Sequence, residues 1–414
     1  MRTASLAVLI AVTASPAVVS AQSWEKPKTF KASEVLTPEE KKGPHHTVGD
    51  KVPTEGFYLA FELHTDFGDL KPVGLDLLRK RVKETQALEA LNEVSKTGVF
   101  LDAAGRSLEA TGKGIVNVAK DPEGTIKGIG TGLKRFGHNL GRKSKRAVED
   151  ATDDESKEEK STAEKTENVA NSVLGVNKSA RTWAQKLQVD PYSRNPILQK
   201  ALIAVAKIDA AGGIATKVVV PIPTVVSTTS TVGSLVWGKD PEALRKANEA
   251  GLATLGVSQE VTAGFFGNDE FTLTEQTRFV AALTAVKAKG LADYVDAARG
   301  AQTPREALFF VESAEMLKRQ HGQASVSVVL TDSRAMVAVS GGGAVALLPL
   351  DYLAWTEPVA QSAAEIAERA KKELGAKGLQ MQLTGQASAR ARKELQGLGW
   401  ALQEKASGGG PRGQ

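Results

Sequence analysis

The sequence of 414 residues contains no cysteine and few aromatic residues. Without cysteine the chain has no disulfide, no thiolate-bound zinc or iron–sulfur cluster, no thiol nucleophile and no lipid-modified N-terminal cysteine. Phe, Trp and Tyr make up 5% of the residues, which argues against base stacking as a mode of nucleic-acid binding. Hydrophobic residues at 41% and charged residues at 24% still indicate a chain that buries a core. At roughly 100–200 residues per domain, the length suits two or three domains.

The sequence also lacks common catalytic and nucleotide-binding motifs, namely H-E-x-x-H, G-x-S-x-G and the Walker pattern G-x-x-x-x-G-K-[ST]. We therefore expect no cofactor, no metal ion and no enzymatic activity. One alternative is a hydrolase that uses His64 and Asp66 beside Asp69, a group that could hold a metal ion or act in acid–base catalysis. A polar turn after a strand explains these residues more simply. Residues 341–343 are three glycines that could cradle an oxyanion, but a hairpin turn is again the simpler interpretation.

The first 21 residues have the pattern of a cleaved export signal. Arg2 supplies a positive charge, residues 4–12 are mostly apolar, and Val19-Ser20-Ala21 places small residues at the usual cleavage positions. A transmembrane anchor needs about 20 apolar residues, and this run is roughly half as long. We expect cleavage after Ala21 and a periplasmic or peripherally envelope-associated protein. Export without cysteine favours a bacterial protein, because secreted eukaryotic domains usually contain disulfides.

Residues 22–56 are polar, rich in Lys, Glu and Pro, and without periodicity, so we expect an extended polar arm. The pattern changes over residues 57–110, which we expect to contain a strand or hairpin followed by a helix. Apolar residues alternate with more polar ones over 57–64, and turn residues follow at 66–69, which together predict a short N-terminal β-hairpin. From Leu75 onward the apolar spacing is that of an amphipathic helix.

Residues 177–323 are mostly helical in pattern and predict a helical domain. Several helix starts can be read from capping residues. Asn195 and Asp240 each precede a proline, the arrangement of an N-cap followed by proline at the first helical position. Thr272 and Thr303 each stand three residues before a glutamate, which predicts capping boxes.

Residues 218–238 carry no charged side chain over 21 positions, a composition that invites comparison with a membrane span. Pro221 and Pro223 lie near one end of this stretch, and residues 227–231 in its middle are polar. Both features are unfavourable in the hydrocarbon region of a bilayer. We therefore predict a buried connection within the helical domain.

Residues 324–407 predict a small α/β domain of element order ββ(β)αβαβ, followed by a flexible tail over 408–414. Together with the helical middle region and the N-terminal hairpin, this domain makes the expected fold class α+β. The predicted strands are 326–330, 335–339, 344–350, 379–383 and 400–402, and the predicted helices are 359–374 and 388–395.

Residues 111–148 form a glycine-rich basic segment that contains nine Lys or Arg and two acidic residues, which gives a net charge of +7. On a helical wheel the apolar side chains fall on one arc and most of the cations on the other side. This pattern is typical of a helix that lies in a membrane surface. The predicted membrane-binding residues are the apolar Ile126, Ile129, Leu133, Phe136 and Leu140 and the cations Lys127, Lys134, Arg135, Arg142 and Lys143.

Six glycines between residues 124 and 141 make this helix costly, at about 1 kcal/mol each relative to alanine. Three partners could offset that cost: an anionic bilayer, a protein that approaches the glycines closely, or the protein's own core. Nucleic acid is the weakest candidate, because export removes most targets and Phe136 is the one aromatic residue there. Residues 149–168 reverse the sign, with nine acids and three lysines, so we predict an acidic linker over 149–176.

The sequence thus favours a non-enzymatic, envelope-associated protein that uses residues 111–148 to bind a partner. The expected partner is an anionic membrane surface, bound reversibly, or another protein of the envelope. A soluble periplasmic binding or scaffold module is the first alternative, with the C-terminal α/β domain as the contact surface. The hydrolase with a site near His64 is the second. No nucleic acid is expected as a partner.

Overall fold

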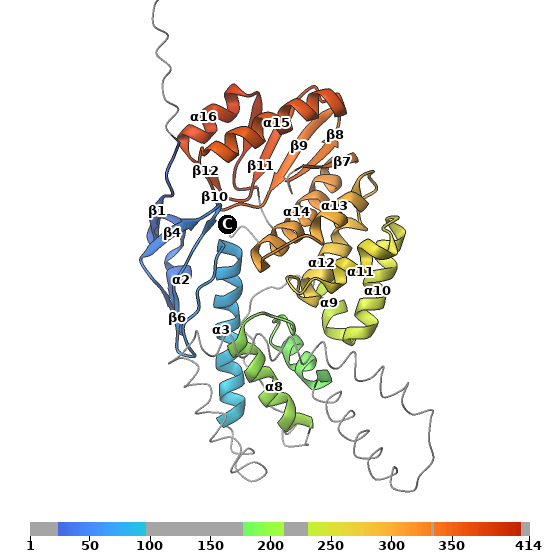
Figure 1. Ribbon diagram of the computed structural model, residues 1–414. Coiled ribbons are helices and arrows are strands. Elements are labelled where there is room, and N and C mark those ends of the chain that lie inside the picture. The colour runs from blue at the N-terminus through green and yellow to red at the C-terminus, as the bar shows by residue number, and fades with distance from the viewer. Residues whose placement is uncertain (1–23, 97–176, 211–230, 333–334, 407–414) are drawn as a thin grey trace, which may run out of the picture.

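The computed structural model describes residues 24–96, 177–210, 231–332 and 335–406 of the chain (Figure 1). Short strands of the N-terminal part lie on one side, helices fill the middle, and a sheet covered by helices forms the C-terminal part. The α+β class predicted from the sequence is confirmed.

The N-terminal part contains two small antiparallel sheets, with strand orders β1-β4-β5 and β2-β3-β6. The expectation of an extended polar arm over residues 22–56 is therefore wrong for residues 29–55. Each strand is so short that its apolar residues form no periodic run, yet Val48 and Val52 are buried in one core with Leu59. The elements are β1 (Thr29–Lys31), α1 (Ala32–Val35), α2 (Pro38–Lys41), β2 (Lys42–Gly43), β3 (His46–Val48), β4 (Lys51–Glu55), β5 (Tyr58–Leu59) and β6 (Leu63–Thr65).

The alternating stretch after residue 56 is extended, as predicted, but it serves both sheets. Its β5 half pairs with β4, and its β6 half pairs with β3. The side chains of Leu59, Phe61 and Leu63 are buried, whereas Phe57 is 39% exposed. The turn predicted at 66–69 is present after β6. The alternation was therefore a valid strand signal, although it did not show that the strand changes partner midway.

Helices of the middle part begin at the positions that the capping residues in the sequence indicate. Asp240 and Thr272 each accept a hydrogen bond from a backbone N–H of the first turn. Thr303 does the same, while the Glu306 carboxylate accepts from the N–H of Gln302 at 2.7 Å. The helices are α3 (Leu75–Lys96), α8 (Pro196–Ala210), α9 (Thr231–Gly238), α10 (Pro241–Thr254), α11 (Gln259–Gly267), α12 (Leu273–Leu283), α13 (Leu291–Ala298) and α14 (Pro304–Gln323), and residues 177–186 are also helical.

The C-terminal part has the predicted order ββ(β)αβαβ, with a sheet of strand order β13-β11-β9-β8-β7. β9, β11 and β13 are parallel, and β7 and β8 are antiparallel to their neighbours. Two short strands that the sequence did not indicate, β10 and β12, pair beside this sheet. The elements are β7 (Val326–Asp332), β8 (Ala335–Ser340), β9 (Gly343–Leu348), β10 (Tyr352–Leu353), α15 (Glu357–Leu374), β11 (Leu379–Leu383), β12 (Gln386–Ala387), α16 (Ala389–Gly397) and β13 (Trp400–Gln403).

The hydrophobic core continues across the boundary predicted at residue 324. One cluster of buried side chains joins Phe310 and Leu317 of α14 to Met336 of β8 and Leu347 of β9. Side chains on the other face of the sheet pack with α15 and α16 in a second cluster. The helical and α/β parts therefore share a packed interface, and the sheet is covered on both faces.

The start of the described chain is bound to the C-terminal part. The N–H of Glu25 donates to the carbonyl of Trp355 at 3.0 Å, and the Glu25 carboxylate accepts from the Trp355 N–H at 2.5 Å. The same carboxylate accepts from the hydroxyl of Ser388, the N-cap of α16, also at 2.5 Å. These contacts hold the first described residues against the α/β part.

Among the described residues, no helix combines the length and the apolar character that crossing a bilayer requires. The uncharged stretch 218–238 lies inside the described residues only from Thr231, where α9 begins. In α9, Val236 is 3% exposed, and the indole N–H of Trp237 donates to the carbonyl of Val189 at 2.9 Å. Val236 and Trp237 thus attach this part of the stretch to the helical region, and the prediction of a buried connection over residues 218–230 lies outside the described residues.

Candidate functional sites

One end of the molecule is formed by three helical segments that share an apolar cluster. The segments are the second half of α3, residues 177–189, and α8, and we call this region the helical end (Figure 1). Apolar residues recur on α3 and α8 at the spacing that places them on one face of a helix. The buried members are Ala87, Leu88, Ala90, Leu91, Val94, Trp183, Ala184, Leu187, Val189, Ile197, Leu198, Ala201, Leu202 and Val205.

A buried polar network fixes the direction in which α8 runs. The Glu84 carboxylate of α3 accepts from the hydroxyl of Ser193 at 2.5 Å and from the amide of Asn195, the residue before α8, at 3.0 Å. The guanidinium of Arg81 donates to the same carboxylate at 2.6 Å. Because α8 starts beside Glu84 and packs along the rest of α3, the two helices run in the same direction and end together.

The helix that starts at residue 177 begins beside the end of α8. The hydroxyl of Ser179 and the indole N–H of Trp183 both donate to the carboxylate of Asp209. The residues that border 97–176 on both sides, and those that precede 211–230, are therefore gathered at the helical end (Figure 1).

The residues predicted to bind a membrane lie outside the described residues, so their helical wheel remains a prediction. The same holds for the acidic linker over 149–176, for the export signal and for the tail over 408–414. The structure contributes the places where the chain enters and leaves residues 97–176, and both are at the helical end.

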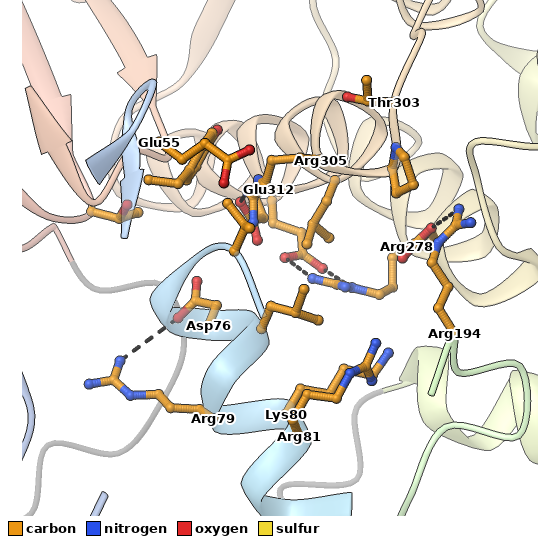
Figure 2. A pocket seen from close by; sticks show the side chains of 18 of the residues that line it. Glu55, Asp76, Arg79, Lys80, Arg81, Arg194, Arg278, Thr303, Arg305 and Glu312 are labelled. Atoms are coloured by element: carbon orange, nitrogen blue, oxygen red, sulfur yellow. Dashed lines mark hydrogen bonds and ion pairs between the residues drawn. The ribbon is translucent and has the colours of Figure 1, made fainter. Parts of the chain in front are cut away.

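A second region is a cleft of about 680 Å³ between α3, α12, α14 and the N-terminal sheets. Figure 2 shows Arg305 and Glu312 on α14 facing the first turns of α3, which present Asp76 and Lys80, while Arg278 reaches in from the side. Basic lining residues outnumber acidic ones by eight to five. They are Lys71, Arg79, Lys80, Arg81, Arg194, Arg278, Arg305 and Arg319 against Glu55, Asp76, Glu275, Glu312 and Glu315.

Most of these charges form ion pairs within the protein. Nε and Nη2 of Arg278 donate to the two carboxylate oxygens of Glu315, each at 2.9 Å, a two-point geometry that orients both side chains. Arg305 donates to Glu312, which lies on α14 one turn before Glu315. The guanidinium of Arg305 also lies 3.9 Å from the ring centre of Tyr58, a cation–π contact. Further pairs join Arg194 to Glu275 at 3.3 Å and Lys80 to Asp190 at 2.8 Å.

Two cations of the cleft differ from the rest. Within the part of the chain that the structure describes, Arg319 and Lys71 form no hydrogen bond or ion pair with a protein group. Lys71 is exposed, but Arg319 is half-buried. In addition, Nε of Arg305 is buried without a hydrogen-bond partner. Unsatisfied donors of this kind are rare inside proteins, because each loses its water without gaining a protein acceptor.

The ionisation of the cleft carboxylates follows their surroundings. Burial raises the pKa of Glu312 to about 7, although the nearby Arg305 opposes the rise. Burial acts on Glu315 in the same direction, but Arg278 outweighs it and holds the pKa of Glu315 below its usual value. Burial also raises the pKa of Asp351, whose carboxylate accepts from the N–H groups of Leu59 and Leu75 at 3.0 Å each. With a pKa of about 7, Glu312 titrates near neutral pH.

The structure separates the residues of the predicted His64 site. Nδ1 of His64 lies 3.1 Å from Asp69, whereas Asp66 pairs with His45 at 2.9 Å. The His64 and Asp69 side chains are 53% and 61% exposed. In the described ranges, no group of three or more His, Cys, Asp or Glu side chains could hold a metal ion. The polar-turn interpretation is consistent with this arrangement.

Gly341 and Gly342 form the predicted hairpin turn between β8 and β9, and Gly343 begins β9. Gly341 and Gly342 have φ angles of 59° and 80°, a backbone conformation that side chains disfavour. The sequence, by contrast, did not predict the cleft, since its ion pairs join residues far apart in the chain.

No protein-family model, curated protein or solved structure matches this chain.

Proposed function

We propose that the protein is an exported, non-enzymatic protein of the bacterial envelope that binds an anionic membrane surface reversibly. The binding element is the basic segment 111–148, with Ile126, Ile129, Leu133, Phe136 and Leu140 toward lipid and Lys127, Lys134, Arg135, Arg142 and Lys143 toward the headgroups. One observation supports this proposal above the others: the chain leaves for residues 97–176 and returns from them at the same helical end.

Binding to a bilayer can offset the free-energy cost of forming a helix from this glycine-rich segment. A bilayer contributes about 1 kcal/mol for each basic residue near its surface, and burial of the apolar arc adds to this. These contributions offset the roughly 6 kcal/mol that six helical glycines cost. Since both borders are held by one packed cluster, the segment is attached to the folded body at the helical end, and we infer that this end faces a membrane to which the segment binds.

Flotation with lipid vesicles tests the proposal. The chain from Gln22 is mixed with phosphatidylglycerol or phosphatidylcholine vesicles at low and high salt. The test variant combines Lys134→Gln, Arg135→Gln, Arg142→Gln and Lys143→Gln. The matched control removes four exposed cations of the C-terminal part, with Lys371→Gln, Lys372→Gln, Lys377→Gln and Lys393→Gln.

We expect the unmodified chain to float with the anionic vesicles at low salt and to be released by high salt, because exposed charges are screened. At about 1 kcal/mol per cation, the test variant should bind roughly a thousandfold more weakly. The control should bind like the unmodified chain. Equal loss in both variants, or equal flotation with neutral vesicles, would overturn the assignment of anionic-lipid binding to this segment. No flotation with either vesicle would favour a soluble binding module instead.

A further inference from the structure

We propose that the cleft between α3 and α14 is a binding site for a small organic ligand that carries an oxyanion, a phosphate or a carboxylate, which Arg319 binds. This site is separate from the segment proposed to bind membranes. The cleft is lined by the first half of α3, whereas the second half of α3 belongs to the helical end, where that segment is attached.

The charge of the cleft points to an anion. Eight basic side chains line it against five acidic ones, and the acidic ones are largely engaged by arginines. Arg278 and Arg305 are neutralised by Glu315 and Glu312. Arg79, Lys80 and Arg81 pair with Glu40, Asp190 and Glu84 at the border of the cleft. The cations left without a protein partner in the described ranges are Lys71 and Arg319, and Arg319 lies on the last turns of α14.

Arg319 is in the position of a ligand-binding group. Its side chain is half-buried against the cleft, and in the described ranges it makes no hydrogen bond or ion pair with the protein. A guanidinium that has lost part of its water and gained no acceptor is destabilising, and an oxyanion would supply two acceptors at once.

The remaining lining indicates that the ligand has an organic portion. Leu77, Leu308 and Met316 contribute apolar surface beside the charged groups, and Tyr58 adds an aromatic side chain to the lining. A cleft of about 680 Å³ lies in the range of cavities that hold small organic molecules. A bare inorganic ion would leave this apolar surface in contact with water.

Titration calorimetry on the chain from Gln22 tests the site with two soluble probes, glycerol 3-phosphate and succinate. The variant Arg319→Gln removes the charge and keeps much of the length of the side chain. The matched control is Arg369→Gln, which removes an arginine of α15 on the other side of the sheet. Circular dichroism and a urea midpoint confirm that both variants are folded.

We expect at least one probe to bind, and Arg319→Gln to weaken its binding tenfold or more, since hydrogen bonds to charged groups contribute about 1.5–3 kcal/mol. Arg369→Gln should bind like the unmodified chain. Binding of neither probe at millimolar concentration, or equal weakening in both variants, would overturn the proposal.

A second arm separates a soluble ligand from a lipid headgroup. The four-residue variant of segment 111–148 that abolishes flotation should keep its affinity for the soluble probe, because the cleft is intact. If flotation with phosphatidic acid vesicles depends on Arg319 as strongly as the soluble probe does, the oxyanion is that of a lipid headgroup. If the four-residue variant loses probe binding while Arg319→Gln retains it, the cleft is not the site.

Discussion

The two halves of α3 face different surroundings and are built from different chemistry. The first half, from Leu75 to Glu84, carries four basic and two acidic residues, most of which line the cleft or form ion pairs. The second half, from Ala87 to Val94, is buried against α8 and residues 183–189 through apolar side chains. One continuous helix therefore joins a region where charge is arranged for recognition to a region where packing holds three chain segments together.

This difference explains why the two regions suit different tasks. Ion pairs such as Arg278 with Glu315 orient side chains strongly but contribute little net stability once the loss of water is counted. Apolar packing of the helical end is stabilising without being specific for a ligand. We infer that the helical end supplies the stability on which the geometry of the cleft depends.

Loss of Glu84 should have the largest effect, because this residue lies where the two halves meet. Glu84 is 1% exposed and accepts hydrogen bonds from Arg81, Ser193 and Asn195. Glu84→Ala leaves the buried Arg81 without its partner, so we expect a loss of about 3–5 kcal/mol in the free energy of unfolding, measured by urea titration. Glu89→Ala, on the same helix at a half-buried position, should change stability by less than about 1 kcal/mol. Equal losses would show that the network is not the connection between α3 and α8.

Matched leucines compare the two halves directly. Leu91 is 2% exposed within the helical end, whereas Leu77 is half-buried at the cleft. Leu91→Ala should lower the free energy of unfolding by about 3 kcal/mol, since it creates a cavity in a closed core. Leu77→Ala should cost clearly less, because its site is open to solvent. A larger loss from Leu77→Ala in the same urea titration would contradict the assignment of stability to the helical end.

The cleft should make stability depend on pH through Glu312. Its pKa is about 7 in the folded protein against an ordinary value of 4.5. Between these values the folded state binds more protons than the unfolded state, so this group's contribution to stability is complete below pH 4.5 and is lost as pH rises through 7. We expect Glu312→Gln to reduce the loss of stability between pH 5 and 8 by on the order of 2 kcal/mol. Urea midpoints that change with pH equally in both proteins would contradict a raised pKa.

The smallest effect is expected from an exposed ion pair on the first half of α3. Arg79 lies 2.7 Å from Glu40, and its side chain is 51% exposed. Arg79→Gln should lower the free energy of unfolding by less than about 1 kcal/mol, because water screens the pair and both side chains lose freedom in forming it. A loss above about 2 kcal/mol in thermal or urea unfolding would show that charges at the cleft stabilise the fold more than this comparison allows.

The parts of the fold that follow local rules could be predicted from the sequence. The C-terminal order of strands and helices was confirmed because alternation, glycine turns and helix caps act over a few residues, as at Thr272 and Gly341. The N-terminal sheets were missed, since β1 pairs with β4 and β3 with β6, and each strand contributes only one or two buried residues. Short strands with distant partners leave no periodic signal.

The cleft could not be predicted for a related reason. Its ion pairs join residues 37 positions apart, as in Arg278 with Glu315, or 110 apart, as in Lys80 with Asp190. In the sequence these side chains resemble ordinary surface charges, and only the packing of α3 against the middle helices brings them together. The basic segment is the opposite case, because its pattern is plain in the sequence and lies outside the described residues.

The central claim is that the helical end faces the membrane, and energy transfer from a single label to the lipid surface tests it directly. The chain has no cysteine, so Lys207→Cys on α8 and Lys393→Cys on α16 each introduce one labelling site at an exposed lysine. α8 and α16 lie at opposite ends of the molecule (Figure 1). With acceptor-labelled phosphatidylglycerol vesicles, we predict strong transfer from the label at residue 207 and much weaker transfer from the label at residue 393. Equal transfer from both, or stronger transfer from residue 393, would contradict the account.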